Sequence, residues 1–161
     1  MNILLPFARV LACLIILTIV GCAQNVRIKS ITKPTAQIER VAVVDVTDQG
    51  VRLDFFVTLD NPNDDPLPLT LARYEAAVGS LGAYTGNIVP DVTIPGHGQQ
   101  SVRLPVVLAT PAGGSVHNMH WSLSGAIEYM PPGQIRELLN DMSFPRPTTN
   151  VSGNGIIGDA P

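Results

Sequence analysis

The sequence predicts an all-β fold, an antiparallel β-sandwich with one short helix. From about residue 37 onward, apolar and polar residues alternate with a period of two, as in strands that bury one face. Turn-forming residues interrupt this alternation at short intervals; they are Gly50, Pro66, Gly79, Ser80, Gly96, Gly98 and Pro111. Many short strands separated by frequent turns are typical of a sandwich. A chain of 161 residues is the size of one domain.

The strands can be placed in order along the chain. Residues 41–46 are rich in β-branched side chains, residues 47–50 form a turn and residues 51–59 alternate, which predicts an antiparallel hairpin. Later strands are expected at residues 69–78, at 84–94 as a pair broken around Pro90, at 101–108 and at 121–130. The aromatic residues on these strands are expected to pack in or beside the core; they are Tyr74, Trp121 and Tyr129.

One segment departs from the strand pattern. Between residues 132 and 142 the apolar residues are Ile135, Leu138, Leu139 and Met142, which is helical spacing over two turns. We expect this helix to cap one end of the sandwich. Residues 143–157, which include prolines, are expected to supply a final edge strand, so that the domain covers residues 37–157. Residues 158–161 are expected to form a disordered tail.

The N-terminal segment has the pattern of a secretory signal peptide. Residues 10–21 are apolar apart from Thr18 and follow a short head that carries Arg9. The apolar run stops before Gln24, and it is short for a membrane-spanning helix, which needs about 20 consecutive apolar residues. The sequence therefore predicts export from the cytoplasm.

Residues 19–22 resemble the lipobox of bacterial lipoproteins, in which the cysteine takes a diacylglycerol on its thiol and becomes the new N-terminus. This resemblance implies a lipoprotein signal peptide at residues 1–21, a lipidated Cys22 that carries palmitate-type chains, and a tether at residues 22–36. Two alternatives stay open: Cys22 is an ordinary thiol after an uncleaved anchor, or a plain signal peptide is cut elsewhere. Because Ala23 follows the cysteine, the resemblance implies a lipid-anchored envelope protein, on the outer membrane and facing the periplasm if the source has two membranes.

Charge and cysteine content exclude several classes of function. The chain has 10 Lys and Arg residues against 13 Asp and Glu residues, and its net charge is −3. It has no run of basic residues, so nucleic acid is not expected as a partner. The 2 cysteines, Cys13 and Cys22, are too few for a disulfide scaffold or a cysteine-rich zinc site.

The candidate residues for chemistry do not form a recognisable catalytic or metal-binding pattern. The oxygen-rich segment 60–65 does not match a calcium loop, and we interpret it as a solvated turn. His117 and His120 have a zinc-like spacing without a nearby third ligand, and His97 lies between glycines in an expected exposed turn. No nucleophile, base and orienting group converge in the pattern, so we predict no enzyme activity, cofactor, metal or small-molecule substrate.

A family resemblance runs through the middle of the chain. The strand at residues 51–60 leads into Asn61, Pro62 and Asn63, and a proline-containing apolar segment follows at 64–69. Together with residues 71–79, 94–98, 101–108 and 121–127, this order resembles the late embryogenesis abundant (LEA) type 2 family, also called the water stress and hypersensitive response (WHy) domain. The resemblance covers residues 36–130 and implies an immunoglobulin- or fibronectin-III-like sandwich.

The resemblance also sets the functional expectation. Members of this family are associated with desiccation and stress, and they have no established catalytic residues. We therefore expect a non-enzymatic, membrane-tethered lipoprotein that responds to water stress and protects client or envelope proteins, with Asn61, Pro62 and Asn63 as a structural turn. The alternative is a periplasmic structural or interaction module that docks an envelope protein partner.

Overall fold

The computed structural model describes residues 30–109, 115–141 and 144–158. The predicted signal peptide, Cys22 and nearly all of the predicted C-terminal tail lie outside these residues. Within the described part of the chain, no helix is both long and apolar enough to cross a membrane.

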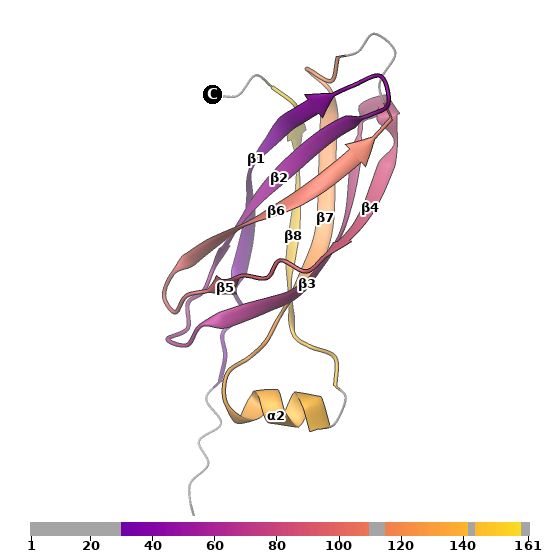
Figure 1. The fold of residues 1–161 in the computed structure, drawn as a ribbon. Helices are drawn as coiled ribbons and strands as arrows, with labels where there is room; N and C mark the ends of the chain where they lie inside the picture. Colours follow the sequence, from indigo (N-terminus) through magenta and orange to yellow (C-terminus); the bar gives the residue numbers. More distant parts are fainter. Residues whose placement is uncertain (1–29, 110–114, 142–143, 159–161) are drawn as a thin grey trace, which may run out of the picture.

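Two antiparallel sheets face each other in a sandwich (Figure 1). The first sheet has the order β1-β2-β6, formed by Thr35–Val46, Val51–Asp60 and Gln99–Leu108. The second has the order β4-β3-β7-β8, formed by Ala83–Ile88, Leu67–Val78, His120–Tyr129 and Thr148–Ile156. The short strand β5, Thr93–Ile94, pairs with the beginning of β3. A 3₁₀ turn, η2 at Gly79–Leu81, joins β3 to β4.

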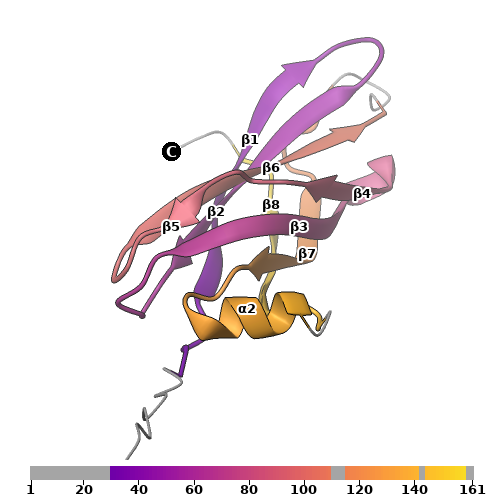
Figure 2. The same cartoon turned by 60° about the horizontal axis from the view of Figure 1, so that its bottom comes forward.

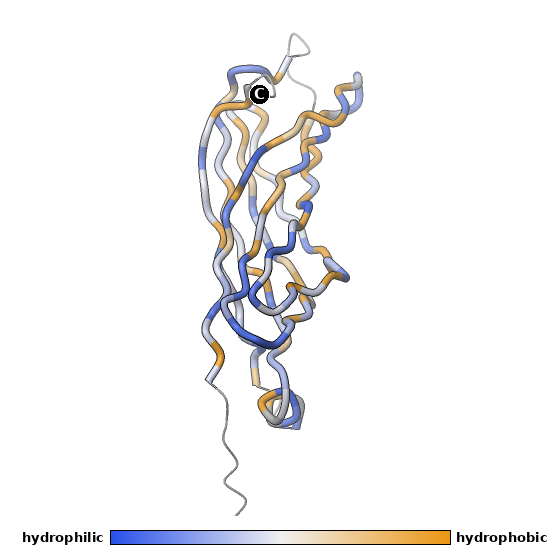
Figure 3. Tube along the Cα trace, turned by 90° about the vertical axis from the view of Figure 1, so that its left-hand side faces the viewer, coloured by the Kyte–Doolittle hydropathy of each residue, from blue (hydrophilic) through white to orange (hydrophobic). Residues whose placement is uncertain are grey.

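The core lies between the sheets and follows from the alternation in the sequence. In β2 every second residue is fully buried; these are Val51, Leu53, Phe55, Val57 and Leu59. Figure 3 shows hydrophobic and hydrophilic residues alternating along the strands. Phe55 meets Trp121 of the opposite sheet edge to face, with ring centroids 5.3 Å apart. Burial of such side chains is the main stabilising contribution, about 25 cal/mol per Å² of apolar surface.

The two sheets are also joined at their edges by hydrogen bonds. Strands β1 and β8 lie side by side, and the buried Thr149 hydroxyl donates to the Pro34 carbonyl at 2.6 Å. On the other side of the sandwich, the hydroxyl of Tyr74 in β3, the strand next to the edge strand β4, donates to the Pro105 carbonyl of β6 at 2.5 Å. Burial, with smaller contributions from Tyr84 and Asp54, raises the pKa of Tyr74 well above its ordinary value. Tyr74 is therefore expected to keep its proton to a higher pH than an exposed tyrosine does.

The predicted strands are confirmed in order. The 47–50 turn joins β1 to β2, with the Thr47 amide donating to the Gly50 carbonyl at 2.9 Å. Residues 84–94 divide into β4 and β5 on either side of Pro90, and β8 is the expected edge strand. The architecture is therefore the predicted all-β antiparallel sandwich of immunoglobulin-like type.

The predicted helix is confirmed as α2, Gln134–Asp141, and it lies at one end of the sandwich (Figures 1 and 2). The first described residues enter the molecule at this same end, and the last described residues leave at the opposite end (Figure 1). The strands pack mainly on one another, and in the described residues α2 shares no extended contact with any of them. The helix is thus an appendage to the sandwich, carried on the connection between β7 and β8.

Candidate functional site

The best-defined polar cluster in the structure surrounds Asn61, at the end of β2. Its side chain is fully buried. The amide nitrogen donates to the backbone carbonyls of Asp65 at 2.8 Å and Pro95 at 3.0 Å. The amide oxygen accepts from the backbone and side-chain nitrogens of Asn63, at 3.1 and 2.8 Å. Both halves of the Asn61 amide are therefore satisfied inside the protein, as a buried polar group requires.

Asn63 extends this cluster to the segment that enters the domain. Its side-chain oxygen accepts from the Thr32 amide, and its side-chain nitrogen donates to the Thr32 carbonyl, both at 2.8 Å. This pair of bonds resembles the pairing between neighbouring strands, with an asparagine side chain in the place of one backbone. Asn63 thus fixes the chain ahead of β1.

Backbone contacts bring in the turn between β5 and β6. The backbone amide of Asn61 donates to the backbone carbonyl of Gly98 at 3.0 Å, and the backbone amide of His97 donates to the backbone carbonyl of Asn63 at 2.9 Å. A side chain at Gly96 would collide with the backbone carbonyl of Asp64, so only glycine permits this approach. We call Asn61, Pro62 and Asn63, with their partners Thr32 and residues 95–98, the Asn-Pro-Asn junction.

The chemistry of the junction is that of a structural joint. Pro62 favours an extended conformation for the residue before it, which aims the Asn61 side chain inward. The Asn61 amide does not titrate, and its hydrogen-bonding groups are already engaged with the backbone. The junction connects three segments that are distant in the sequence: the entering chain, the turn after β2 and the turn before β6. The sequence indicated the turn, but the contact with Thr32 carries no local signal.

The histidines of interest lie on the surface. His97 is exposed, as expected, and its Nε2 lies 2.7 Å from Asp64 Oδ1. Such an exposed pair contributes little to stability. His117 and His120 are exposed in and just before the start of β7. Among the described residues no three histidines, cysteines or carboxylates lie close enough together to hold a metal ion.

A second charged cluster lies on the outer face of the first sheet. Asp54 is buried there, with 2% of its surface exposed. Its carboxylate oxygens lie 3.7 Å from Arg52 Nε and 3.5 Å from Arg103 Nη1. Nearby, the guanidinium of Arg40 lies 3.6 Å from the ring centroid of Phe56. The long arginine side chains cover both the carboxylate and the ring, which explains the burial of Asp54.

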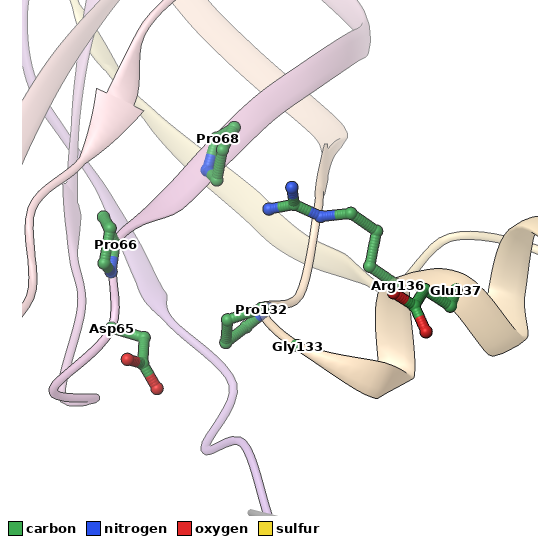
Figure 4. A pocket seen from close by; sticks show the side chains of 7 residues that line it. All are labelled: Asp65, Pro66, Pro68, Pro132, Gly133, Arg136 and Glu137. Atoms are coloured by element: carbon green, nitrogen blue, oxygen red, sulfur yellow. The ribbon is translucent and has the colours of Figure 1, made fainter.

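A hollow of about 420 Å³ lies between the turn after β2 and the first turn of α2 (Figure 4). Its lining residues are Asp65, Pro66, Pro68, Pro132, Gly133, Arg136 and Glu137. The walls combine prolines with charges of both signs. No group of side chains in it converges on one point (Figure 4), so we assign no ligand to it.

The arrangement of strands is similar to that of two solved structures. The first is the solution structure of a protein described as late embryogenesis abundant, At2g46140.1. The two chains share 19% identity, the match covers 80% of this chain and 74% of the other, and the TM-score is 0.56. The chain has the fold of a late embryogenesis abundant protein.

The second similar structure is that of AT1g01470 from Arabidopsis thaliana. It shares 16% identity with this chain, with 83% of this chain and 86% of the other covered and a TM-score of 0.61. No protein-family model matches the sequence, and neither does any curated protein. At these identities the likeness concerns the LEA fold, which agrees with the fold that the motifs around Asn61 implied.

Proposed function

We propose that this chain is a lipid-anchored, non-enzymatic member of the LEA type 2 family that acts in the response to desiccation. The observation that carries the proposal is the fold shared with the protein described as late embryogenesis abundant. The order of motifs around Asn61, Pro62 and Asn63 supports the same family. The lipobox-like residues that end at Cys22 support an anchor in the cell envelope.

Protection during drying is the direct test of the proposed activity. A labile enzyme is dried and rehydrated with the chain from residue 23 onward, and its recovered activity is measured. The control is an unrelated β-sandwich of similar size and net charge at the same mass concentration. Recovery above this control supports a protective role, and recovery equal to it contradicts one.

The anchor has its own test. Cys22→Ser removes the thiol that would take the diacylglycerol, so we expect the variant to lose incorporation of labelled palmitate in growing cells. Cys13→Ser is the matched control, because Cys13 lies inside the apolar run and should leave labelling intact. Unchanged labelling of the Cys22→Ser variant would contradict the lipoprotein assignment.

A second candidate, docking of an envelope protein partner, is favoured by one specific observation. Exposed apolar side chains gather toward the end of the first sheet that lies away from α2, where Val44 is 48% and Val107 54% exposed. A hollow of about 350 Å³ adjoins them, lined in part by Val107, Arg52 and Gln49. Crosslinking from Gln49 in intact cells tests this candidate, and one reproducible protein partner would support it over direct protection.

A further inference from the structure

Three arginines from different strands gather over β2 on the outer face of the first sheet: Arg40 from β1, Arg52 from β2 itself and Arg103 from β6. The guanidinium of Arg40 lies over the Phe56 ring. The guanidiniums of Arg52 and Arg103 both approach the Asp54 carboxylate. Because Asp54 and Phe56 are two residues apart on β2, their side chains lie on the same face, about 7 Å apart along the strand. The three positive groups are therefore concentrated over one short stretch of the sheet.

These guanidiniums keep most of their hydrogen-bond donors unused. Each arginine carries five N–H donors. The nearest nitrogens of Arg52 and Arg103 lie 3.7 and 3.5 Å from the carboxylate oxygens, which is longer than a charge-assisted hydrogen bond of about 2.7–2.9 Å. In the described part of the chain, Arg40 stacks on an aromatic ring and meets no hydrogen-bond acceptor. On the other sheet, by contrast, Arg73 donates to Glu128 Oε1 at 2.6 Å.

Asp54 draws two of these arginines onto the sheet. Its side chain is only 4% exposed, whereas the side chains of Arg52 and Arg103 are 45% and 60% exposed. Its Oδ1 accepts no hydrogen bond from the described residues, so the buried carboxylate is stabilised by the opposite charges around it. Side chains that are already held in place lose less conformational freedom when a partner binds. The arginines are thus arranged in advance for an anionic group.

The outer face of the first sheet is positive in its middle and negative at its borders. In the middle, Asp54 offsets only one of the three arginines. Three carboxylates border this region, those of Glu39, Asp45 and Asp60. A membrane of anionic lipid presents negative charge over its whole area, so it would be repelled by these borders. A polypeptide can instead place its carboxylates over the arginines alone.

Two hollows adjoin the arginines and extend the surface beyond them. One, of about 350 Å³, is lined in part by Arg52 and by Val107, which is 54% exposed. The other, of about 300 Å³, is lined in part by Arg103 and by Val89, which is 69% exposed. A single small anion would use only the guanidiniums, whereas a polypeptide can also place apolar side chains in the hollows. Arginine is moreover enriched where proteins bind one another.

We propose that this face of the first sheet is a docking surface for an acidic polypeptide segment. The carboxylates of the segment pair with the guanidiniums of Arg40, Arg52 and Arg103, since the planar fork of arginine matches a carboxylate. Apolar neighbours in the segment enter the two hollows. This inference rests on the second candidate function, docking of a protein partner, and adds the chemistry of that partner. It does not depend on the lipid anchor.

The test measures binding of a fluorescent peptide to the full chain in a non-ionic detergent. The peptide alternates glutamate with valine over the length of β2, and the control peptide has glutamine in place of glutamate. Arg40→Gln and Arg103→Gln each remove one positive charge from the proposed surface. Arg73→Gln is the matched control, because Arg73 is 59% exposed, against 60% for Arg103, but lies on the other sheet. Thermal unfolding of every variant verifies that it folds.

We expect Arg40→Gln and Arg103→Gln each to weaken binding of the acidic peptide about tenfold, the effect of one lost charged hydrogen bond. Arg73→Gln should leave binding unchanged, and added salt should weaken binding to the unmodified protein. Arg40→Gln keeps both ion pairs of Asp54, so it tests the surface even if Arg103→Gln destabilises the fold.

Equal binding of the glutamine peptide, an equal loss in Arg73→Gln or no binding of the acidic peptide overturns the proposal. Binding to phosphatidylglycerol vesicles that Arg40→Gln abolishes, without binding of the peptide, also overturns it, because the surface then serves lipid. Crosslinking from Gln49 separates the two proposals. One reproducible protein partner in cells, without binding of the peptide, leaves the docking function standing and overturns only its acidic chemistry.

Discussion

The Asn-Pro-Asn junction and α2 lie at the same end of the molecule, but they are held in different ways. At the junction, a fully buried amide and a pair of side-chain hydrogen bonds join three distant segments. The helix is attached through its two connections and half-buried side chains, with no strand packed along it in the described residues. The contrast shows that rigidity at this end is concentrated where the chain enters the sandwich.

Removal of the buried amide should have the largest effect. Asn61→Ala removes a fully buried side chain together with its hydrogen bonds to the part-buried carbonyls of Asp65 and Pro95, so we expect the free energy of unfolding to fall by about 3 kcal/mol. Chemical denaturation of the chain from residue 23 measures this. Asn87→Ala, at an exposed position of β4, is the control and should change stability by less than about 0.5 kcal/mol. Equal effects of the two substitutions would mean that the junction is not a centre of stability.

Substitution of Tyr74 tests how much one hydrogen bond between the sheets, away from the junction, contributes to the free energy of unfolding. Tyr74→Phe removes the bond to the Pro105 carbonyl and should reduce stability by about 1.5 kcal/mol at neutral pH. Because burial raises the pKa of Tyr74, the folded protein keeps this proton to a higher pH than the unfolded chain does. The corresponding stability is present below about pH 10 and declines as the pH rises further. Denaturation at several alkaline pH values should therefore show a shallower decline for Tyr74→Phe, and identical slopes would contradict this assignment.

Asn63 should have a smaller effect on global stability and a clear local one. Its bonds to Thr32 are exposed, so water replaces them in Asn63→Ala, and we expect a loss of about 1 kcal/mol. Hydrogen exchange of the Thr32 amide should become faster, while exchange of amides in the centre of β2 changes only as much as global stability does. Unchanged protection at Thr32 would show that another contact fixes the entering chain.

The helix should contribute least. Leu139→Ala removes a half-buried side chain and introduces a better helix former, so we expect the free energy of unfolding to fall by less than about 0.5 kcal/mol. The fully buried Leu104 is the reference, since truncation to alanine in a core costs about 2 to 5 kcal/mol. A loss for Leu139→Ala as large as for Leu104→Ala would remove the contrast between the two regions.

Much of the fold could be predicted because local signals and burial agree along the strands. The alternation of residues 51–59 corresponds directly to the buried face of β2, and the spacing of Ile135 and Leu139 gave the helix. Proline at position 90 correctly divided β4 from β5. In each case the physical cause acts within a few residues, so a single sequence contains it.

The contacts of the candidate site depend on pairings between distant residues. Asn61 and Asn63 were recognisable as a turn, but their bonds to Pro95 and Thr32 join residues that are more than 30 positions apart. The burial of Asp54 was missed because its position in the alternation indicates the outer face of the sheet. Only the arrival of Arg103 from another strand covers it. Such contacts are set by tertiary packing and leave no periodic trace.

The two hydrogen bonds between Asn63 and Thr32 also determine how a pulling force on the N-terminal segment enters the sandwich. Thr32 lies ahead of β1, and β1 is an edge strand that could be peeled from β2 by a pull on the N-terminus. A force applied to the chain ahead of Thr32 is first borne by the two hydrogen bonds between Thr32 and Asn63. Asn63 transmits it to the buried side-chain amide of Asn61 and to the turn before β6. The load is thus passed to the end of β2 and to the turn before β6 before the first pair of β1 and β2 is strained. A pull on the N-terminal segment would therefore load the Asn-Pro-Asn junction before it loads the pairing of β1 with β2.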